Sequence, residues 1–244
     1  MVVSPNGFAG TIGGGMLELR AIEEACALLQ HGGDAGRLSV ALGPESGQCC
    51  GGRVTLSLKL LTHAEINELK DRIASETENL PHVYVFGAGH VGFELAGNLA
   101  RLPFNVHLAD SRAEALEDCP DGVQCHLLAM PESLVRDAPE GSAFVVMTHD
   151  HGQDFLIASE ALARSDARYV GLIGSKTKRE RFYRDFLRDG GDEKAFGKLV
   201  SPIGGGELKD KRPPVIAALA TAEITQALLC ADTNTHRNKG EAAA

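Results

Sequence analysis

The sequence contains no tryptophan, and only 5% of its 244 residues are aromatic. Basic residues are also few, because 24 lysines and arginines stand against 33 aspartates and glutamates, for a net charge of −9. Nucleic-acid phosphates are bound by clusters of lysine and arginine, so this balance argues against a nucleic-acid partner. The chain has no apolar run of transmembrane length and no recognisable signal peptide. We therefore expect a cytoplasmic protein with no membrane partner.

Cysteine is scarce and irregularly spaced, with six residues in the chain. This spacing does not predict the disulfide framework of a small secreted protein, so we expect reduced thiols. Cys26, Cys119, Cys125 and Cys230 are predicted to be structural. Glycine is abundant by contrast, with 28 residues, and 43% of the chain is hydrophobic. Together these values indicate an α/β chain with many tight turns, long enough for one large domain or two modest ones.

Residues 1–75 predict a small α+β domain. Apolar residues recur at helical spacing from Met16 to Gln30. Two strands follow, at residues 38–42 and 53–61, and the second alternates strictly between apolar and polar residues. Thr62 and Glu65 then form a capping box that starts another helix. One hairpin and one helix are few elements for a domain, so we expect this part to be completed by a homodimer partner.

The loop between the two predicted strands, SGQCCGG, holds two adjacent cysteines. Glycines surround Cys49 and Cys50, and no apolar residue does, so we expect accessible thiols at the tip of a hairpin. Such thiols suit soft-metal ligation or sulfur transfer, and Arg53 nearby can help to hold a thiolate. A zinc site would need more ligands than this loop supplies.

Residues 82–232 change to an alternation of strands and helices, which predicts a parallel sheet covered on both faces. Residues 76–81 have the composition of a linker, and the polar tail at 233–244 is expected to be disordered. The predicted strands are Val83–Phe86, Asn105–Ala109, Val123–Leu128, Ala143–Thr148 and Tyr169–Ile173. The predicted fold class is thus α/β, with a C-terminal Rossmann-like parallel sheet and a small N-terminal α+β domain.

The stretch VFGAGHVG carries a dinucleotide-binding fingerprint. Gly87, Gly89 and Gly92 follow an apolar strand and open a helix, and Asp110 ends the next strand about 20 positions later. Gly89 would let the backbone approach a pyrophosphate beside the positive end of the helix dipole. Asp110 can accept a hydrogen bond from a ribose 2′-hydroxyl, which favours NAD over NADP, although Arg112 weakens that preference. The occupant could be NAD or another nucleotide.

The fingerprint itself and two further segments supply polar residues to the same predicted crevice. His90, next to Val91 in the fingerprint, is expected to be neutral and either contacts a phosphate or packs on the loop. Thr148 and His149 follow the fourth strand and begin the run THDH, which can hold a ligand or a metal, or simply cap the next helix. The turn Gly174–Lys176 follows the fifth strand and suits an anionic group, although it lacks the spacing of a P-loop.

Seven motifs occur in order along almost the whole chain: GTIGGGMLE, LGPESGQCCGG, VFGAGHVG, ADSR, VVMTHDH, YVGLIGSKTKRERF and SPIGG. With these motifs the chain resembles the xanthine dehydrogenase accessory protein family of the XdhC/CoxI type. Members of that family begin tens of residues earlier, with strands and a glycine/proline-rich turn that this chain lacks.

The resemblance implies a chaperone that binds molybdenum cofactor (molybdopterin), supports its sulfuration by a cysteine desulfurase and delivers it to an apo-molybdenum hydroxylase of the xanthine dehydrogenase type. It also implies that the QCCGG loop holds the cofactor, with Cys49 and Cys50 on its molybdenum. The candidate cofactor-binding residues are Gln48, Cys49, Cys50, Gly51, Gly52, Gly87, Gly89, His90, Val91, Gly92, Asp110, Ser111, Arg112, Thr148, His149, Gly174, Ser175 and Lys176.

Two other functions remain open. The fingerprint and Asp110 also fit an NAD-dependent oxidoreductase, with His149 or His151 as the proton-transfer group. A nucleotide or redox sensor that signals to a partner protein is the third possibility. As a cofactor chaperone the protein would not itself be an enzyme, whereas as an NAD-dependent oxidoreductase it would be one.

Overall fold

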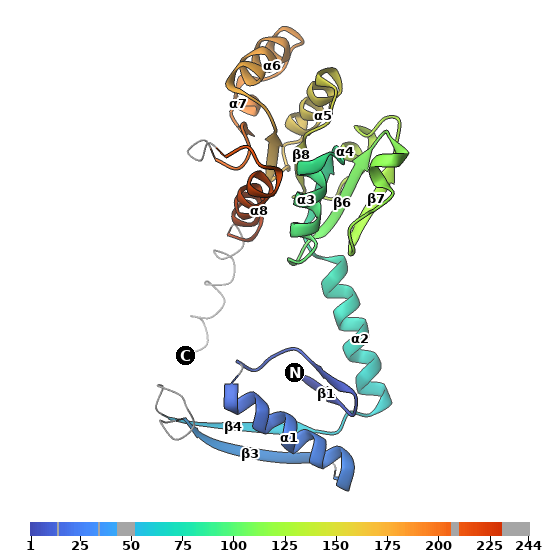
Figure 1. Cartoon of the computed structure of the whole chain (residues 1–244), viewed down its shortest axis with the longest axis vertical. Coiled ribbons are helices and arrows are strands. Elements are labelled where there is room, and N and C mark those ends of the chain that lie inside the picture. The colour runs from blue at the N-terminus through green and yellow to red at the C-terminus, as the bar shows by residue number, and fades with distance from the viewer. Residues whose placement is uncertain (14, 34, 43–51, 206–209, 231–244) are drawn as a thin grey trace. The chain divides into compact units, whose positions relative to one another are not determined.

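The structure is a computed structural model that describes residues 1–13, 15–33, 35–42, 52–205 and 210–230 (Figure 1). The chain divides into two compact units, Met1–Ile73 and Ala74–Ala244. Within the described ranges, every helix is too short or too polar to cross a lipid bilayer.

The first unit contains two antiparallel hairpins and a long helix. One hairpin pairs β1 with β2, and the other pairs β3 with β4. The helix confirms the one predicted over residues 16–30. The elements are β1 (Val2–Ser4), β2 (Gly7–Ala9), α1 (Gly15–His31), β3 (Ala35–Leu42) and β4 (Gly52–Lys59).

The two hairpins differ in how well the sequence predicts them. In β4, Val54, Leu56 and Leu58 are half-buried and the residues between them are exposed, which confirms the predicted alternation. The β1–β2 hairpin was not predicted. Its strands are three residues long and almost entirely exposed, so they carry no alternating pattern. The expectation of a single hairpin in this unit is therefore wrong.

Helix α2 (His63–Glu78) begins at the predicted capping box. The Thr62 N–H donates to Glu65 Oε2 at 2.9 Å, and the Glu65 N–H donates to Thr62 Oγ1 at 3.3 Å. Each side chain thus satisfies a backbone donor that the first turn leaves unpaired. The helix continues through residues 76–78, so this part of the predicted linker is helical.

The second unit is built on a six-stranded parallel sheet with the order β10-β9-β8-β5-β6-β7. This order confirms the Rossmann-like fold class, and the strand order reverses between β5 and β8. All five predicted strands are present, with ends that shift by one or two residues. The sequence missed the sixth, which is only two residues long. The strands are β5 (His82–Phe86), β6 (Asn105–Asp110), β7 (Val123–Leu127), β8 (Ala143–Val146), β9 (Tyr169–Leu172) and β10 (Leu199–Val200).

Helices cover both faces of this sheet, as a parallel sheet requires (Figure 1). Helices α3 and α8 pack on one face, where Val83, Leu95 and Ile224 belong to one buried core. The other face is covered by α4 to α7, and Phe86 packs in the same core as Phe182. The helices are α3 (His90–Leu99), the 3-10 helix η2 (Ala113–Leu116), α4 (Ser133–Asp137), α5 (His151–Ala163), α6 (Lys176–Arg188), α7 (Glu193–Phe196) and α8 (Pro213–Leu229).

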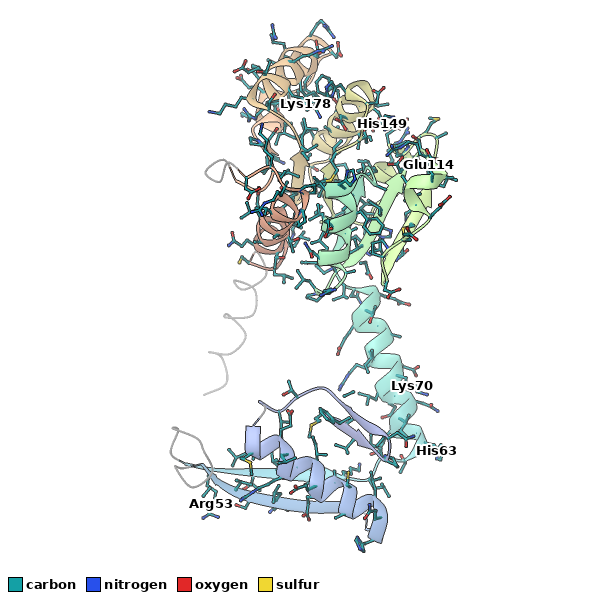
Figure 2. The ribbon with its side chains drawn as sticks, in the orientation of Figure 1. Arg53, His63, Lys70, Glu114, His149 and Lys178 are labelled. Atoms are coloured by element: carbon teal, nitrogen blue, oxygen red, sulfur yellow. A yellow bond between two sulfur atoms is a disulfide. The ribbon has the colours of Figure 1, made fainter. Side chains whose placement is uncertain are left out.

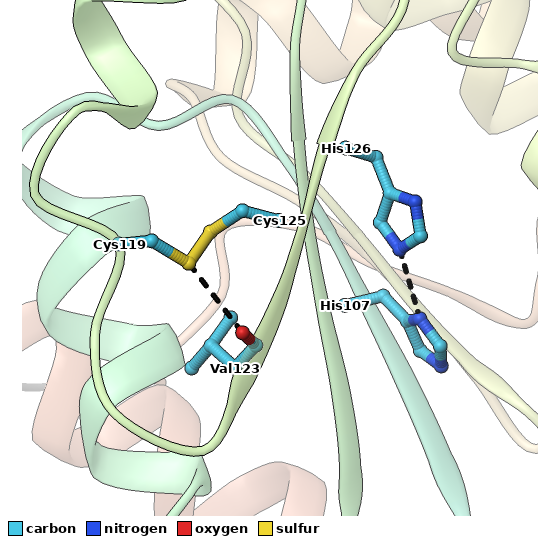
Figure 3. The surroundings of a disulfide bond; sticks show 5 residues. All are labelled: His107, Cys119, Val123, Cys125 and His126. Atoms are coloured by element: carbon cyan, nitrogen blue, oxygen red, sulfur yellow. Dashed lines mark hydrogen bonds between the residues drawn. A yellow bond between two sulfur atoms is a disulfide. The ribbon is translucent and has the colours of Figure 1, made fainter.

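A row of three histidines runs across β5, β6 and β7. His82 Nδ1 lies 3.0 Å from His107 Nε2, and His107 Nδ1 lies 3.1 Å from His126 Nε2; Figure 3 shows the second contact. The His107 ring is 7% exposed and stacks on Tyr84 with their centroids 4.3 Å apart. Burial, with the neighbouring His126 and His82, lowers the pKa of His107 to about 4. Burial also lowers the pKa of His82 and of His126. The row is therefore neutral at neutral pH.

We expect the free energy of unfolding to fall as the pH falls from about 6.5 to about 4. The unfolded chain protonates His107 with the ordinary pKa of 6.5, whereas the folded protein protonates it only near pH 4. The unfolded state therefore binds more protons throughout this window, and the full shift corresponds to about 3 kcal/mol. Urea denaturation across the window measures the effect. Tyrosine fluorescence reports the second unit alone, because Tyr84, Tyr169 and Tyr183 all lie there.

The variant His107→Phe isolates this contribution. It keeps an aromatic ring against Tyr84 but removes the titrating group, so the loss of stability at acidic pH should be smaller than in the parent. His63, exposed at the start of α2, supplies the control: it lies in the first unit, which tyrosine fluorescence does not report, so His63→Phe should leave the measured curves unchanged. Parallel curves for His107→Phe and the parent would contradict the expectation.

Cys119 and Cys125 form a disulfide bond, with their Cα atoms 6.3 Å apart (Figure 3). The expectation of reduced thiols is therefore wrong for this pair. The chain turns back between them, where the Val123 N–H donates to the Pro120 carbonyl oxygen at 3.1 Å, and spacing alone does not reveal that turn. Cys26 is half-buried in α1, and Cys230 is exposed at the end of α8.

Candidate nucleotide-binding site

The carboxyl ends of the strands in the second unit carry the loops that the sequence singles out. Open α/β sheets bind ligands outside this edge, at the point where the strand order reverses, here between β5 and β8. Figure 2 shows Glu114, His149 and Lys178 at this same end of the unit, although they follow three different strands. The predicted site residues here are Gly87, Gly89, His90, Val91 and Gly92 after β5; Asp110, Ser111 and Arg112 at the end of β6; Thr148 and His149 after β8; and Gly174, Ser175 and Lys176 after β9.

Two glycines of the first loop are required by the protein itself. A Cβ atom on Gly87 would lie 2.4 Å from the Met147 carbonyl oxygen, and Gly87 has a φ of +108°. A Cβ atom on Gly92 would lie 1.9 Å from the Gly87 carbonyl oxygen. No side chain fits at such distances from backbone atoms. The β5–α3 turn, the start of α3 and the end of β8 are therefore in direct backbone contact.

Gly89 is different, because nothing in the described part of the protein requires a glycine there. Its φ is −76°, and a Cβ atom would meet no described atom within 4 Å. Gly89 is also the N-cap residue of α3, and no side-chain hydrogen bond caps this helix. Unpaired N–H groups and the positive end of the helix dipole are thus left beside exposed, bare backbone, as an anionic ligand requires. His90 is exposed next to them, and Val91 is half-buried.

The Asp110 carboxylate holds the glycine loop in place. It is buried, with 5% exposure, and Oδ2 accepts from the Ala88 N–H at 2.8 Å and from Arg112 Nη2 at 2.9 Å. Oδ1 accepts from the Arg112 backbone N–H and from Nε, both at 3.0 Å. Burial raises the pKa of Asp110, but the hydrogen bonds from Arg112 and Ala88 outweigh it and lower the pKa to about 2. The group is therefore an anion near neutral pH.

These four hydrogen bonds bear on the predicted contact with ribose. A carboxylate offers about four lone-pair sites, and each is already paired in Asp110. An interaction with a 2′-hydroxyl would have to displace one of them. Arg112 keeps donors beyond those that it gives to Asp110, and its side chain is 39% exposed, so this corner of the crevice presents a cation. Ser111 is exposed beside it.

The loop after β8 is organised by helix capping and by one buried carboxylate. Asp150 caps α5, because its Oδ1 accepts from the Gln153 N–H at 2.9 Å. Thr148 donates from both its N–H and its Oγ1 to Asp154 Oδ1, at 2.8 Å each. His149 and His151 are exposed, and the described residues contain no group of three His, Cys, Asp or Glu side chains that could hold a metal ion. The capping alternative is confirmed for Asp150.

The turn after β9 is capped and then fastened to the β8 loop. Ser175 Oγ accepts from the Lys178 N–H at 3.3 Å and caps α6. Lys178 Nζ donates to Asp154 Oδ2 at 2.5 Å and to the Ile173 carbonyl oxygen at 2.9 Å. The carboxylate is fully buried and the lysine side chain is 11% exposed. Lys176 is exposed at the start of α6 and remains available to an anionic ligand.

Asp154 and Lys178 organise the candidate site, and the sequence did not reveal either of them. Their ion pair fixes the loops after β8 and β9, and through Thr148 it fixes the backbone next to Gly87. Asp154 lies in the first turn of α5, where an acidic residue is ordinary, and Lys178 lies in a basic run that reads as a solvated helix face. Only the sheet order shows that these two helix starts are neighbours.

The last loop, SPIGG, is held by α8. Glu223 Oε2 accepts from the Gly204 N–H at 2.8 Å, and Glu223 Oε1 accepts from the Tyr169 hydroxyl at 3.3 Å. Gly204 has a φ of +78°, which suits a glycine in this turn. The loop follows β10 and so belongs to the same edge of the sheet.

Four of the predicted site residues, Gln48, Cys49, Cys50 and Gly51, lie outside the described residues. Gly52 is the first residue of β4 in the first unit. Two cavities in the described part of the second unit lie away from the predicted crevice residues. One, of about 590 Å³, lies between α5, α6 and α7, and the other, of about 300 Å³, is lined by residues such as His82 and Arg168.

Comparison with known proteins agrees with this architecture. The sequence model described as the XdhC Rossmann domain matches residues 83–224, and the one described as the XdhC and CoxI family matches residues 1–40. The uncharacterized protein YqeB of Escherichia coli (strain K12) is 26% identical over 238 residues. That alignment covers 93% of this chain but 40% of YqeB, so the chain spans less than half of that relative's length.

A solved structure shares the fold over nearly the whole chain. It is the crystal structure of a protein described as a xanthine dehydrogenase, from Bacillus halodurans, with a TM-score of 0.71 and 17% sequence identity. The match covers 99% of this chain and 87% of that one. Because the Rossmann-domain match alone spans more than half of the residues, the chain belongs to the XdhC and CoxI family of xanthine dehydrogenase accessory proteins.

Proposed function

We propose that this protein acts in the maturation of xanthine dehydrogenase-type molybdenum enzymes. In this role it binds molybdenum cofactor as cargo, supports its sulfuration by a cysteine desulfurase and delivers it to the apoenzyme. Membership of the XdhC and CoxI family supports the general role. The binding, sulfuration and delivery steps rest on the chemistry of the crevice and of the QCCGG loop.

The observation that carries the proposal is the contrast among the three fingerprint glycines. Gly87 and Gly92 are glycines because the protein's own backbone fills the space, whereas Gly89 has open space at its Cβ position. Bare backbone beside an uncapped helix start is what a phosphate group requires. The pterin part of molybdenum cofactor carries a phosphate, as does any nucleotide attached to it. Arg112 and Lys176, both solvent-accessible, supply positive charge at the same edge.

In the QCCGG loop of the first unit, Cys49 and Cys50 are the residues that we propose hold the molybdenum of the cargo, with Gln48, Gly51 and Gly52 next to them in the sequence. Thiolates are soft ligands that suit molybdenum and the transfer of its sulfur. We therefore expect Cys49→Ser/Cys50→Ser to retain at most about one tenth of the parent's molybdopterin, a change of about 1.4 kcal/mol in binding. The measurement is molybdopterin per protein after purification from a host that makes the cofactor.

The matched control is Cys26→Ser/Cys230→Ser, which removes two thiols from outside the proposed site. It should keep the parent's molybdopterin content. Equal retention by the Cys49→Ser/Cys50→Ser variant and the parent would overturn the cargo assignment. Mass spectrometry of the parent from the same molybdenum-replete host identifies which nucleotide, if any, accompanies the pterin.

The NAD-dependent oxidoreductase is the second candidate, because the fingerprint and sheet order fit a dinucleotide. The four hydrogen bonds to Asp110 count against it, since they leave no lone pair for the adenosine ribose. Titration with NADH separates the two functions: a fluorescence change that saturates would favour the oxidoreductase. Size-exclusion chromatography of the same preparation measures the oligomeric state and so tests the proposed homodimer. A change of oligomeric state when nucleotide is added would favour a sensor.

A further inference from the structure

The Cys119–Cys125 disulfide lies where it can respond to the redox state of the surroundings. Both residues are half-buried rather than sealed in the core. Cys125 lies in β7, the edge strand of the sheet, and Cys119 lies in the segment that connects η2 to that strand. Disulfides that solvent can reach exchange with small thiols more readily than buried ones, and many are regulatory.

The surroundings also accommodate the reduced form. Cys119 Sγ lies 3.4 Å from the Val123 carbonyl oxygen, which is within hydrogen-bond reach for a thiol (Figure 3). Once the disulfide is reduced, the two sulfur atoms separate by rotation of their side chains, and the Val123 carbonyl oxygen is the acceptor nearest to the Cys119 thiol. Cys125 packs beside apolar residues such as Val123, where a neutral thiol is tolerated. Neither oxidation state therefore leaves a buried polar group without a partner.

The disulfide ties the segment between η2 and β7 to β7, a strand that pairs with β6 along its whole length. The turn between the cysteines rests on the last part of α3, where a Cβ atom on Gly97 would lie 3.8 Å from Pro120 and one on Gly122 would lie 3.7 Å from Ala100. The short helix η2 precedes this turn and contributes only half-buried apolar residues, Ala115 and Leu116, to the core. A covalent tie to β7 restricts this segment more than such packing does.

The tied segment begins at the candidate site. Arg112 is the N-cap residue of η2, and its side chain pairs with Asp110, which holds the glycine loop through Ala88. Only six residues separate Arg112 from Cys119. Greater backbone mobility at Cys119 therefore extends to Arg112, the cation at the edge of the crevice.

We infer that Cys119 and Cys125 form a reversible redox switch that controls the order of residues 113–122 beside the nucleotide crevice. In the oxidising direction, a small-molecule disulfide such as oxidised glutathione accepts two electrons. Its S–S bond breaks, the Cys119–Cys125 S–S bond forms, and the two thiol protons leave with the two released small thiols. The reverse exchange opens the switch.

The switch is tested on the whole chain in buffers of graded ratios of reduced to oxidised glutathione. Differential alkylation and peptide mass spectrometry should show Cys119 and Cys125 losing reactivity together as the buffer becomes oxidising. Cys26, which has no disulfide partner, should not follow the same transition. If Cys119 and Cys125 stay alkylatable in the most oxidising buffer, the inference is overturned.

Hydrogen exchange then measures the effect on the chain. Amides of residues 113–122 should exchange about tenfold faster in the reduced protein, a difference of about 1.4 kcal/mol in local opening, while amides of β5 stay unchanged. Cys119→Ser should show the fast exchange in every buffer, and Cys26→Ser should keep the redox response. Equal exchange of residues 113–122 in both oxidation states would also overturn the inference. These readouts need no ligand, so they do not depend on whether the protein carries molybdenum cofactor.

Discussion

Replacing Gly92 with alanine is expected to destabilise the second unit by about 3–5 kcal/mol or to prevent it from folding. The added Cβ atom would lie 1.9 Å from the Gly87 carbonyl oxygen and 3.2 Å from Met147 Sδ. A flexible side chain could yield at such a distance, but a backbone carbonyl in the β5–α3 turn cannot, because the turn is held from both sides. The Gly87 N–H donates to the Ala109 carbonyl oxygen at 2.8 Å, and Asp110 binds the next N–H, that of Ala88.

The matched replacement Gly89→Ala should leave the stability of the second unit within about 1 kcal/mol of the parent. Alanine is a poorer N-cap residue than glycine by about 0.5–1 kcal/mol, and it stabilises by a similar amount through restriction of the unfolded chain, so the two effects offset. The backbone at Gly89 is in a conformation that alanine adopts freely, with open space around its Cβ position. Urea denaturation followed by tyrosine fluorescence compares the two variants in the second unit alone.

Ligand binding should fall in the Gly89→Ala variant although its stability is retained. In Gly89→Ala the new methyl group occupies the space in which a phosphate would approach the backbone, so both molybdopterin retention and the affinity for an adenine nucleotide such as ADP should fall about tenfold. A stable Gly89→Ala protein that binds both ligands as the parent does would show that no phosphate lies beside Gly89. A Gly92→Ala protein as stable as the parent would contradict the close packing of this turn.

The sequence could predict the parts of this fold that depend on local pattern. The strands from β5 to β9 follow from runs of apolar residues between turns, and the start of α2 follows from the Thr62–Glu65 capping box, because each signal lies within a few residues. The loops at the carboxyl edge were also predictable, since parallel strands present all such loops at one edge. The expectation that the protein carries molybdenum cofactor came from the resemblance to the XdhC/CoxI family, because no local pattern predicts it.

The remainder depends on which distant residues meet. The row of His82, His107 and His126 exists only because β5, β6 and β7 are neighbours in register, and each histidine alone looks like an ordinary strand residue. The Cys119–Cys125 disulfide depends on a turn that folds the chain back onto the edge strand. The two-residue strand β10 forms only because β9 offers it hydrogen bonds. These features come from tertiary packing, which a single sequence does not display.

Breaking the ion pair between Lys178 and Asp154 should have an effect as large as filling the space at Gly92. We expect Lys178→Met to lower the free energy of unfolding of the second unit by about 3–5 kcal/mol, because it leaves a fully buried carboxylate without its charged partner. Methionine has a similar length and helix propensity, so the helix itself is little affected. After the change, Oδ1 still accepts from Thr148, but Oδ2 loses the Nζ donor at 2.5 Å, and His151 Nδ1 is 3.9 Å away.

The control lies on the same helix. Arg188 pairs with Asp185 at 2.9 Å, but its side chain is 69% exposed, so Arg188→Met should cost less than about 1 kcal/mol. The two variants thus remove a cation from α6 in buried and in exposed surroundings. If Lys178→Met cost no more than Arg188→Met, burial of the Asp154 charge would not be what the lysine compensates.

A double-mutant cycle distinguishes the ion pair from simple packing. Asp154→Asn keeps an oxygen for the Thr148 donors but leaves the Lys178 ammonium facing a neutral amide, so this single change should also be strongly destabilising. In Asp154→Asn/Lys178→Met neither charge remains, and this variant should be more stable than either single variant. Independent, additive costs would instead mean that each side chain only fills space. Asp154 holds Thr148 next to Gly87, so molybdopterin retention measured in the same variants reports how far the buried ion pair positions the crevice. The double variant should regain stability but not full retention, because an amide holds the Thr148 loop less firmly than a carboxylate does.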